Sequence, residues 1–115
     1  MAVGLSVEHH VPRPITMGLR LRGVDVLTAA EHDAAELEDP DLLDRAAIWG
    51  RVLVSQHKDL LIEAKRRHAA GIAFSGVIHA HQLRASIGGC IGDLELIATV
   101  AVPDDLRDRG IYLPL

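Results

Sequence analysis

Apolar residues occur along the chain in short runs, which alternate with longer stretches where they recur every three or four positions. Short runs that are rich in β-branched residues and bounded by polar residues or glycine are typical of strands. The run Val52-Leu53-Val54 is the clearest of them. The sequence predicts five strands, over residues 3–7, 24–27, 51–55, 76–79 and 111–113.

The stretches between these runs have the apolar spacing of amphipathic helices. They predict helices over residues 12–22, 40–49, 58–70 and 87–101, and a short last turn over 104–109. A glycine follows each of the first three helices, as is typical of helix C-termini, and Pro103 ends the fourth. Asp39, directly before Pro40, is expected to be the N-cap of the second helix.

Strands that alternate with helices predict an α/β fold, here as a single domain over residues 1–115. We expect a three-layer sandwich with a mainly parallel sheet of four or five strands, helices on both faces, and Val52 and Val54 buried at its centre. Ligands bind such sheets at the carboxyl ends of the strands. The candidate residues there are Glu8, His9, His10, Thr28, Gln56, His57, Lys58, Asp59, His79 and His81.

Composition and charge narrow the functional classes. Hydrophobic residues make up 49% of the chain and aromatic residues 3%, which predicts an aliphatic core. The formal net charge of −4 argues against a basic domain that coats nucleic acid. The single cysteine, Cys90, excludes an intramolecular disulfide and a multi-cysteine zinc site, and its place in an apolar stripe predicts a core residue. Because no apolar run approaches about 18 residues and no secretory signal is recognisable, we expect a cytoplasmic protein.

Acidic residues gather in two places that reach the predicted carboxyl edge. Between residues 31 and 44 there are seven carboxylates and no Lys or Arg: Glu31, Asp33, Glu36, Glu38, Asp39, Asp41 and Asp44. They fit a solvated loop that leads into a helix, whose positive dipole end favours acids. They also fit a source of one or two ligands for Mg²⁺ or Mn²⁺. Asp59, after the clearest strand, allows the same two interpretations.

The histidines and the basic residues are less informative. His9 and His10 would face opposite sides of an extended segment, whereas His79 and His81 would share a face. Packed or surface histidines are commoner than metal ligands, so the roles of these four stay open. Basic side chains at positions 13, 20, 22, 58 and 65–67 fit either contacts with a nucleic-acid backbone or a solvated helix surface.

A glycine-rich stretch over residues 86–92 opens the fourth predicted helix. It matches neither the phosphate-binding loop of nucleotide-hydrolysing enzymes nor the dinucleotide fingerprint. A helix start with exposed amides can hold a phosphate. We expect instead that the glycines allow close packing between helices.

Several stretches, taken in order, carry a family resemblance. They are Glu8-His9-His10, Gly23-Val24-Asp25-Val26, Glu38-Asp39-Pro40-Asp41, Arg51-Val52-Leu53-Val54-Ser55-Gln56-His57-Lys58-Asp59 and Ser86-Ile87-Gly88. Through them nearly the whole chain resembles the PIN-like proteins of prokaryotic toxin–antitoxin type. These are small metal-dependent ribonuclease domains, so the resemblance implies a PIN-like three-layer fold and a cluster of acids that holds cations.

Carried over residue by residue, the resemblance implies that Glu8, Asp39 and Asp59 hold Mg²⁺ or Mn²⁺ and that the catalytic set is Glu8, Asp39, His57 and Asp59. Glu8 and His9 stand where the family has two acids, and His57 stands at the first position of its Asp-x-Asp pair. A neutral imidazole at position 57 suits softer divalent ions better than Mg²⁺. We expect the three carboxylates to lie within about 10 Å of one another.

Two functions of different classes follow from this resemblance. One is a metal-dependent endoribonuclease, the toxin component of a toxin–antitoxin pair, with RNA as substrate, an antitoxin as partner and a homo-oligomer as a further option. The other is a catalytically degenerate PIN-like module for binding or interaction, which has kept the fold and lost the full set of acids. The number of acids in the cluster separates the two.

Overall fold

The computed structural model describes residues 3–29, 31, 38–81 and 84–115. All the expected helices and strands are present, with ends shifted by a few residues. In chain order they are β1 (Leu5–Val7), α1 (Arg13–Leu21), β2 (Val26–Thr28), α2 (Asp39–Ile48), β3 (Val52–Ser55), α3 (Lys58–Ala70), β4 (Val77–Ala80), α4 (Ile87–Val100), α5 (Pro103–Leu106) and β5 (Gly110–Leu113).

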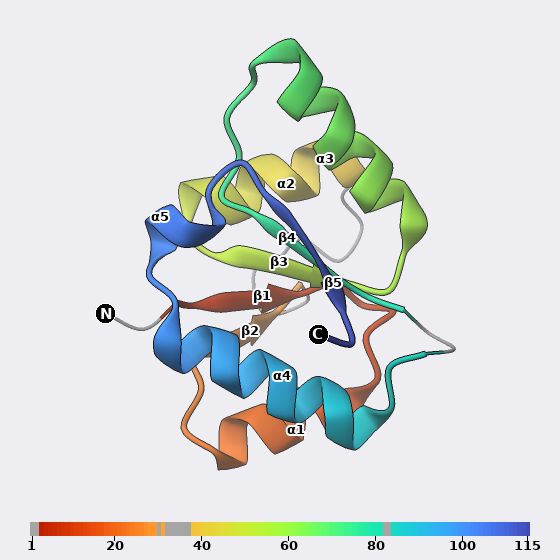
Figure 1. Ribbon diagram of the computed structural model, residues 1–115, viewed down its shortest axis with the longest axis vertical. Helices are drawn as coiled ribbons and strands as arrows, with labels where there is room; N and C mark the ends of the chain where they lie inside the picture. The colour runs from red at the N-terminus through yellow and green to blue at the C-terminus, as the bar shows by residue number, and fades with distance from the viewer. Residues whose placement is uncertain (1–2, 30, 32–37, 82–83) are drawn as a thin grey trace.

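The five strands form one sheet in the order β2-β1-β3-β4-β5, and every pair is parallel. Helices α1 and α4 cover one face and α2 and α3 cover the other, which Figure 1 shows below and above the sheet. The predicted fold class, a three-layer α/β sandwich with a parallel sheet, is therefore confirmed. The longest described helix, α4, has 14 residues, and none in the described part is long and apolar enough to cross a membrane.

Alternation along the strands divides the core into two aliphatic layers. In β3, Val52 and Val54 point towards α1 and α4, whereas Leu53 points towards α2 and α3. Both valines are buried, as expected. Cys90 on α4 belongs to the first layer, which confirms it as a core residue, and burial raises the pKa of its thiol. Strands that are buried on both faces are typical of parallel sheets, which explains their continuous apolar runs.

The last crossover differs from the other three. The chain moves from β1 to β2 through α1, and it moves the other way along the sheet through α2 and α3 on the opposite face. These three crossovers therefore share one hand. Helix α4 lies on the same face as α1, yet its crossover runs from β4 outward to β5. This crossover therefore has the opposite hand to the other three. Parallel β-α-β units strongly prefer a single hand, so the α4 crossover is unusual. This path packs α4 against α1.

Close packing between α1 and α4 depends on a glycine of α1. A Cβ atom at Gly18 would lie 2.5 Å from Cδ1 of Ile91. Gly88 and Gly92 have open space around them within the described residues, so the expectation that the glycines of α4 allow close packing is wrong. The start of α4 is instead capped by Ser86, whose Oγ accepts a hydrogen bond from the backbone N–H of Gly89 at 2.9 Å.

A pair of glycine substitutions tests the surroundings that the structure gives to Gly76 and Gly92. Gly76, before β4, has a φ of +118°, and a Cβ atom there would lie 2.5 Å from the backbone oxygen of Leu106. We expect Gly76→Ala to lower the free energy of unfolding by about 3 kcal/mol or more, because it adds backbone strain to a clash with the main chain. Gly92→Ala, at an exposed helical position, should raise it by about 0.5–1 kcal/mol. Urea unfolding measures both, and effects of the same sign would contradict the structure.

Candidate functional site

The site begins at the end of the central strand β1. Because β1 lies between β2 and β3, the residue that follows it, Glu8, is only 3% exposed. Its backbone N–H donates to the carbonyl of Val54 at 3.0 Å, which continues the pairing with β3. Its side chain lies beside Ser55, whose Oγ donates to Glu8 Oε1 at 3.3 Å. One carboxylate oxygen is thus fixed by the neighbouring strand.

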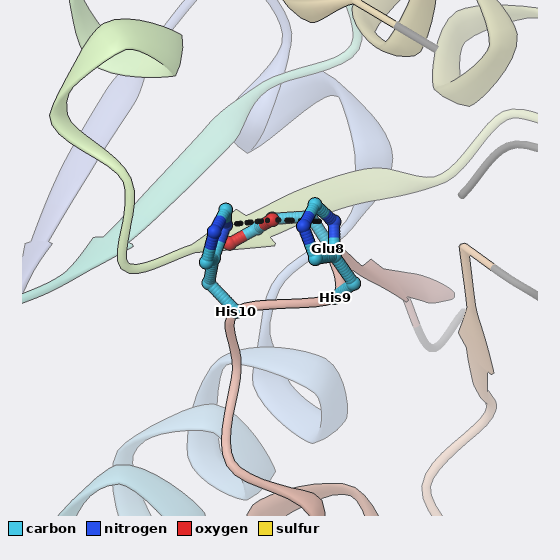
Figure 2. Close-up of side chains that lie close together, drawn as sticks. All are labelled: Glu8, His9 and His10. Carbon is cyan, nitrogen blue, oxygen red and sulfur yellow. Dashed lines mark hydrogen bonds and ion pairs between the residues drawn. The ribbon is translucent and has the colours of Figure 1, made fainter. Parts of the chain in front are cut away.

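The other carboxylate oxygen of Glu8 meets two imidazoles. His10 Nδ1 lies 2.9 Å and His9 Nδ1 lies 3.4 Å from Glu8 Oε2, and Figure 2 shows the two rings on either side of the carboxylate. Residues 9 and 10 form a turn rather than an extended segment, so both rings can reach the same oxygen. The expectation that His9 and His10 face opposite sides does not apply here. Their side chains are 59% and 52% exposed, so this group opens to solvent.

A second group of side chains forms where α2 and α3 begin. His57 precedes α3, and its Nδ1 lies 3.9 Å from Asp39 Oδ2 while its Nε2 lies 3.8 Å from Asp59 Oδ2. Its backbone N–H donates to Ser55 Oγ at 2.7 Å, which holds the turn from β3 into α3. Ser55 is fully buried and bonded in this way, so it supports the site rather than acting as a nucleophile.

The two groups meet through His10 and His57. Their rings are stacked with centroids 5.2 Å apart and planes 14° apart. Ser55 and this ring stack connect the two groups at the carboxyl edge of the sheet. The edge therefore holds all four residues that the resemblance implies: Glu8, Asp39, His57 and Asp59. The sequence placed His9 and His10 among the candidates at this edge, because they directly follow the first strand, but it left their roles open. The structure brings both rings to the carboxylate of Glu8.

Asp39 has a different local role from the one expected. It is the first residue of α2 rather than its N-cap; the cap position belongs to Glu38, which makes no side-chain capping bond among the described residues. The carboxylate of Asp39 therefore turns to His57. Partial burial raises the pKa of Asp39, and the negative charges of Asp59 and Glu8 raise it further, against the opposing effect of His57. Asp39 therefore lies close enough to Asp59 and Glu8 for their charges to affect its ionisation.

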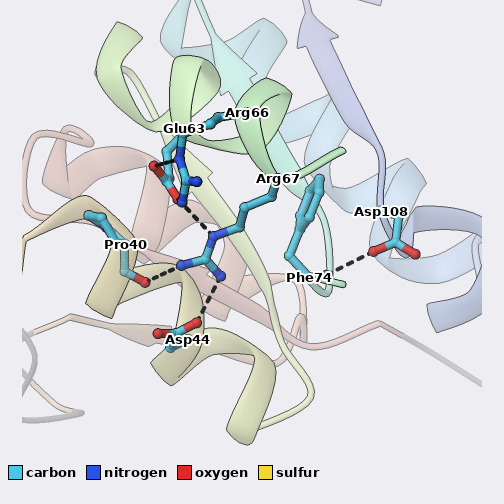
Figure 3. Close-up of polar contacts among 7 residues, drawn as sticks. All are labelled: Pro40, Asp44, Glu63, Arg66, Arg67, Phe74 and Asp108. Atoms are coloured by element: carbon cyan, nitrogen blue, oxygen red, sulfur yellow. Dashed lines mark hydrogen bonds and ion pairs between the residues drawn. The ribbon is translucent and has the colours of Figure 1, made fainter. Parts of the chain in front are cut away.

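An arginine of α3 fixes the position of α2, which carries Asp39. The guanidinium of Arg67 donates to Glu63 Oε2, to Asp44 Oδ1 and to the backbone oxygen of Pro40, each at 2.8 Å, and its side chain is 6% exposed (Figure 3). Hydrogen bonds from Arg66 and then Arg67 lower the pKa of Glu63 to about 2. This network, the Arg67 clamp, ties the first two turns of α2 to α3.

The other acids between residues 31 and 44 have structural roles, are exposed, as Glu38 and Asp41 are, or lie outside the described residues. Asp44 belongs to the Arg67 clamp. Glu31 accepts from Arg20 and, at 2.8 Å, from the backbone N–H of Thr28, and these bonds lower its pKa. Asp33 and Glu36 lie outside the described residues. Of the described acids in this run, Asp39 is the one that shares a possible metal-ligating group with His57 and Asp59.

His79 lies on β4, next to Ser55 of β3, on the side away from Glu8. Ser55 pairs with His79 in register, and His79 pairs with Tyr112. His79 is buried, its ring packs edge-on against Tyr112 at 6.2 Å, and its Nδ1 has no hydrogen-bond partner within the described part of the chain. Burial, followed by His81 and Lys58, lowers its pKa. The imidazole is therefore neutral near pH 7, and it fits the interpretation of a packed histidine.

The cluster offers two sets of metal ligands. Glu8, His9 and His10 form one, and Asp39, His57 and Asp59 form the other; within each set the ligand atoms lie within 4.8 Å of one another. The first set is rich in nitrogen and the second in oxygen. Such mixed donors suit Mn²⁺, Fe²⁺, Co²⁺ or Zn²⁺ better than Mg²⁺, which prefers oxygen alone. Chemically, the arrangement can hold divalent cations at a solvent-accessible edge.

The Arg67 clamp can be tested with two matched substitutions in α3. Arg67→Met leaves the carboxylate of Asp44 and the carbonyl of Pro40 without their partner, and should lower the free energy of unfolding by about 2–4 kcal/mol. Arg66→Met removes an exposed arginine that bonds the same Glu63, and should change stability little. Denaturant unfolding of both variants gives the comparison. Equal losses would show that the clamp does not hold α2.

The raised pKa of Asp39 predicts a pH dependence. In the unfolded chain this carboxyl ionises near its ordinary pKa of 3.8, but in the folded protein it holds its proton to a higher pH. Stability is therefore lost as the pH rises from 3.8 through the folded pKa, and the loss persists at pH 7. Asp39→Asn should raise the urea midpoint at pH 7 in the presence of a chelator, and this gain should vanish near pH 3.5.

The control for Asp39→Asn is Asp41→Asn, which removes an exposed acid from the same first turn of α2. A similar gain in that variant would assign the effect to the helix end instead of the cluster.

Outside comparison adds no information about this site. Comparison of the chain with models of protein families, with curated proteins and with solved structures gives no match. What the chain does has to be inferred from its own residues and their geometry.

Proposed function

We propose that this protein is a metal-dependent endoribonuclease of PIN-like type, the toxin component of a toxin–antitoxin pair, with an altered acidic cluster. One observation carries the proposal. Four ionisable side chains from three distant segments meet at the carboxyl edge of the sheet: Glu8 after β1, Asp39 at the start of α2, and His57 and Asp59 around the start of α3. Parallel α/β sheets bind their ligands at this edge.

In the proposed reaction, water hydrolyses a phosphodiester bond of RNA. A Mn²⁺ or Mg²⁺ ion held there would supply an activated water and would stabilise the negative charge that develops on the phosphate. Glu8, Asp39 and Asp59 would hold the ion, and the hydrogen bond from Ser55 keeps the Glu8 carboxylate in place. His57 lies within 4 Å of both aspartates, where it would serve as a further ligand or carry a proton.

The biological setting is part of the same proposal. RNA would be the substrate, a separately folded antitoxin would cover the site, and self-association is a further option. A single buried cysteine is typical of a protein that works in the reducing cytoplasm, where we place it.

The alternative is a catalytically degenerate module that uses the same edge for binding. One observation favours it. Glu8 already has internal partners on both oxygens, Ser55 on Oε1 and His10 on Oε2, so the buried carboxylate is compensated within the protein itself. Under this alternative His9 and His10, instead of a metal ion, are the partners of the Glu8 carboxylate. The folded protein then needs no metal to be stable.

Metal dependence separates the two functions. For the enzyme we expect Mn²⁺ to raise the melting temperature more than Mg²⁺ does, because imidazole is a better ligand for Mn²⁺, and we expect RNA cleavage to depend mainly on Mn²⁺. Asp59→Asn should abolish both the cleavage and the shift with Mn²⁺. Asp104→Asn on α5, at the opposite edge of the sheet, is the control and should change neither.

His57→Asp restores the acid that the resemblance implies at this position. It should raise the affinity for Mg²⁺, since it adds a hard anionic oxygen ligand. Thermal shift titration with Mg²⁺, together with a gel assay of RNA cleavage, measures the effect. No shift with either ion, combined with no cleavage by the original chain or by His57→Asp, would overturn the enzyme and leave the binding module.

A further inference from the structure

We infer that His9 and His10, together with Glu8, form a further preformed site for a nitrogen-preferring divalent ion such as Zn²⁺, beside the oxygen-rich group of Asp39, His57 and Asp59 and sharing with it the carboxylate of Glu8. The inference deepens the proposed function, because both groups line the same edge. It rests on that function for the ion's part in RNA cleavage, but not for the binding of the ion.

Ligand spacing is the first argument. Zinc lies about 2.0–2.1 Å from imidazole nitrogen and carboxylate oxygen, so neighbouring ligand atoms lie about 2.9 Å apart in octahedral and about 3.3 Å apart in tetrahedral coordination. Glu8 Oε2 lies 2.9 Å and 3.4 Å from the two Nδ1 atoms, so both distances to the carboxylate match these spacings, and the ligand atoms of all three residues lie within 4.8 Å of one another. In the other group, His57 lies 3.9 Å and 3.8 Å from its aspartates, so that group has to contract around an ion.

Orientation and burial are the second argument. Ser55 holds Oε1 of Glu8, and this directs Oε2 towards the imidazoles. Such a hydrogen bond to a ligating carboxylate is typical of the partners that orient metal ligands. The carboxylate is buried whereas both histidines are more than half exposed, so the site has a fixed anionic base and an open side (Figure 2). An ion can enter from solvent and keep positions free for water, as catalytic zinc does.

The donor set is the third argument. Two neutral imidazoles and one carboxylate suit Zn²⁺, Co²⁺, Fe²⁺ or Ni²⁺, whereas two carboxylates and one imidazole at the other group suit Mn²⁺ better. Glu8, His9 and His10 would hold one ion and the second group another, and the stacked rings of His10 and His57 mark where the two groups meet. When no ion is bound, the 2.9 Å distance between His10 Nδ1 and Glu8 Oε2 is that of a hydrogen bond. A measurement of metal binding therefore distinguishes a metal site from a hydrogen-bonded pair.

The test is a titration of the full-length, chelator-treated protein with Co²⁺, which replaces Zn²⁺ and reports its ligands by visible absorption. Binding is followed by this absorption and by calorimetry, with circular dichroism as the check on folding. We expect the original chain to show a saturable Co²⁺ spectrum that Zn²⁺ abolishes by displacement. The double variant His9→Ala, His10→Ala should bind at least about a hundredfold more weakly, beyond the loss typical of removing an outer partner of a ligand.

Two further variants locate the ion. Asp59→Asn should keep the Co²⁺ spectrum, because it changes only the other group, and His68→Ala on α3 controls for binding to exposed histidines. The inference is overturned if the original chain shows no saturable spectrum, if the double variant retains it, or if Asp59→Asn loses it. RNA cleavage is scored separately: an intact Co²⁺ site without cleavage would refute the proposed ribonuclease and leave this site standing.

Discussion

The constraint on which the site depends is the burial of a carboxylate at the end of the central strand. Strand β1 has neighbours on both sides and Glu8 is buried at its end, so the carboxylate has to be compensated where it lies. Ser55 from β3 and the imidazoles of the following turn supply that compensation. Ser55 also accepts the N–H of His57 and so carries the same constraint to the start of α3. The buried carboxylate of Glu8 and its partner Ser55 thereby connect the two groups of side chains at this edge.

The rest of the scaffold brings a second set of acids to this point at some cost in stability. The Arg67 clamp fixes α2 against α3, and with it the first residue of α2, Asp39. Asp39 then lies near Glu8 and Asp59, and partial burial and like charges raise its pKa. A carboxyl whose pKa is raised by burial and by neighbouring acids is typical of a candidate functional site. This is why the edge of the sheet, and not the apolar layers, is the place to look for function.

Much of this could be predicted from local patterns. The alternation of apolar runs with helical stripes predicted all five strands and the parallel sheet, because strands buried on both faces and helices with one apolar face each leave their own periodicity in the chain. The rule that ligands bind at the carboxyl ends pointed to Glu8, His57 and Asp59. The glycines of α4 were misjudged because they lie off the buried apolar stripe of that helix, and the close approach is made by Gly18 of α1 against Ile91 instead.

The sequence by itself therefore determined the layers of the fold and the edge where chemistry belongs, since both follow from neighbouring residues and their period. Only the tertiary structure decided which side chains meet there. His9 and His10 join Glu8 because a turn after β1 brings both rings to one oxygen, and Asp39 is free to meet His57 because α2 begins one residue earlier than its sequence predicted. Contacts between segments far apart in the chain depend on strand order and helix position, and no local pattern encodes these.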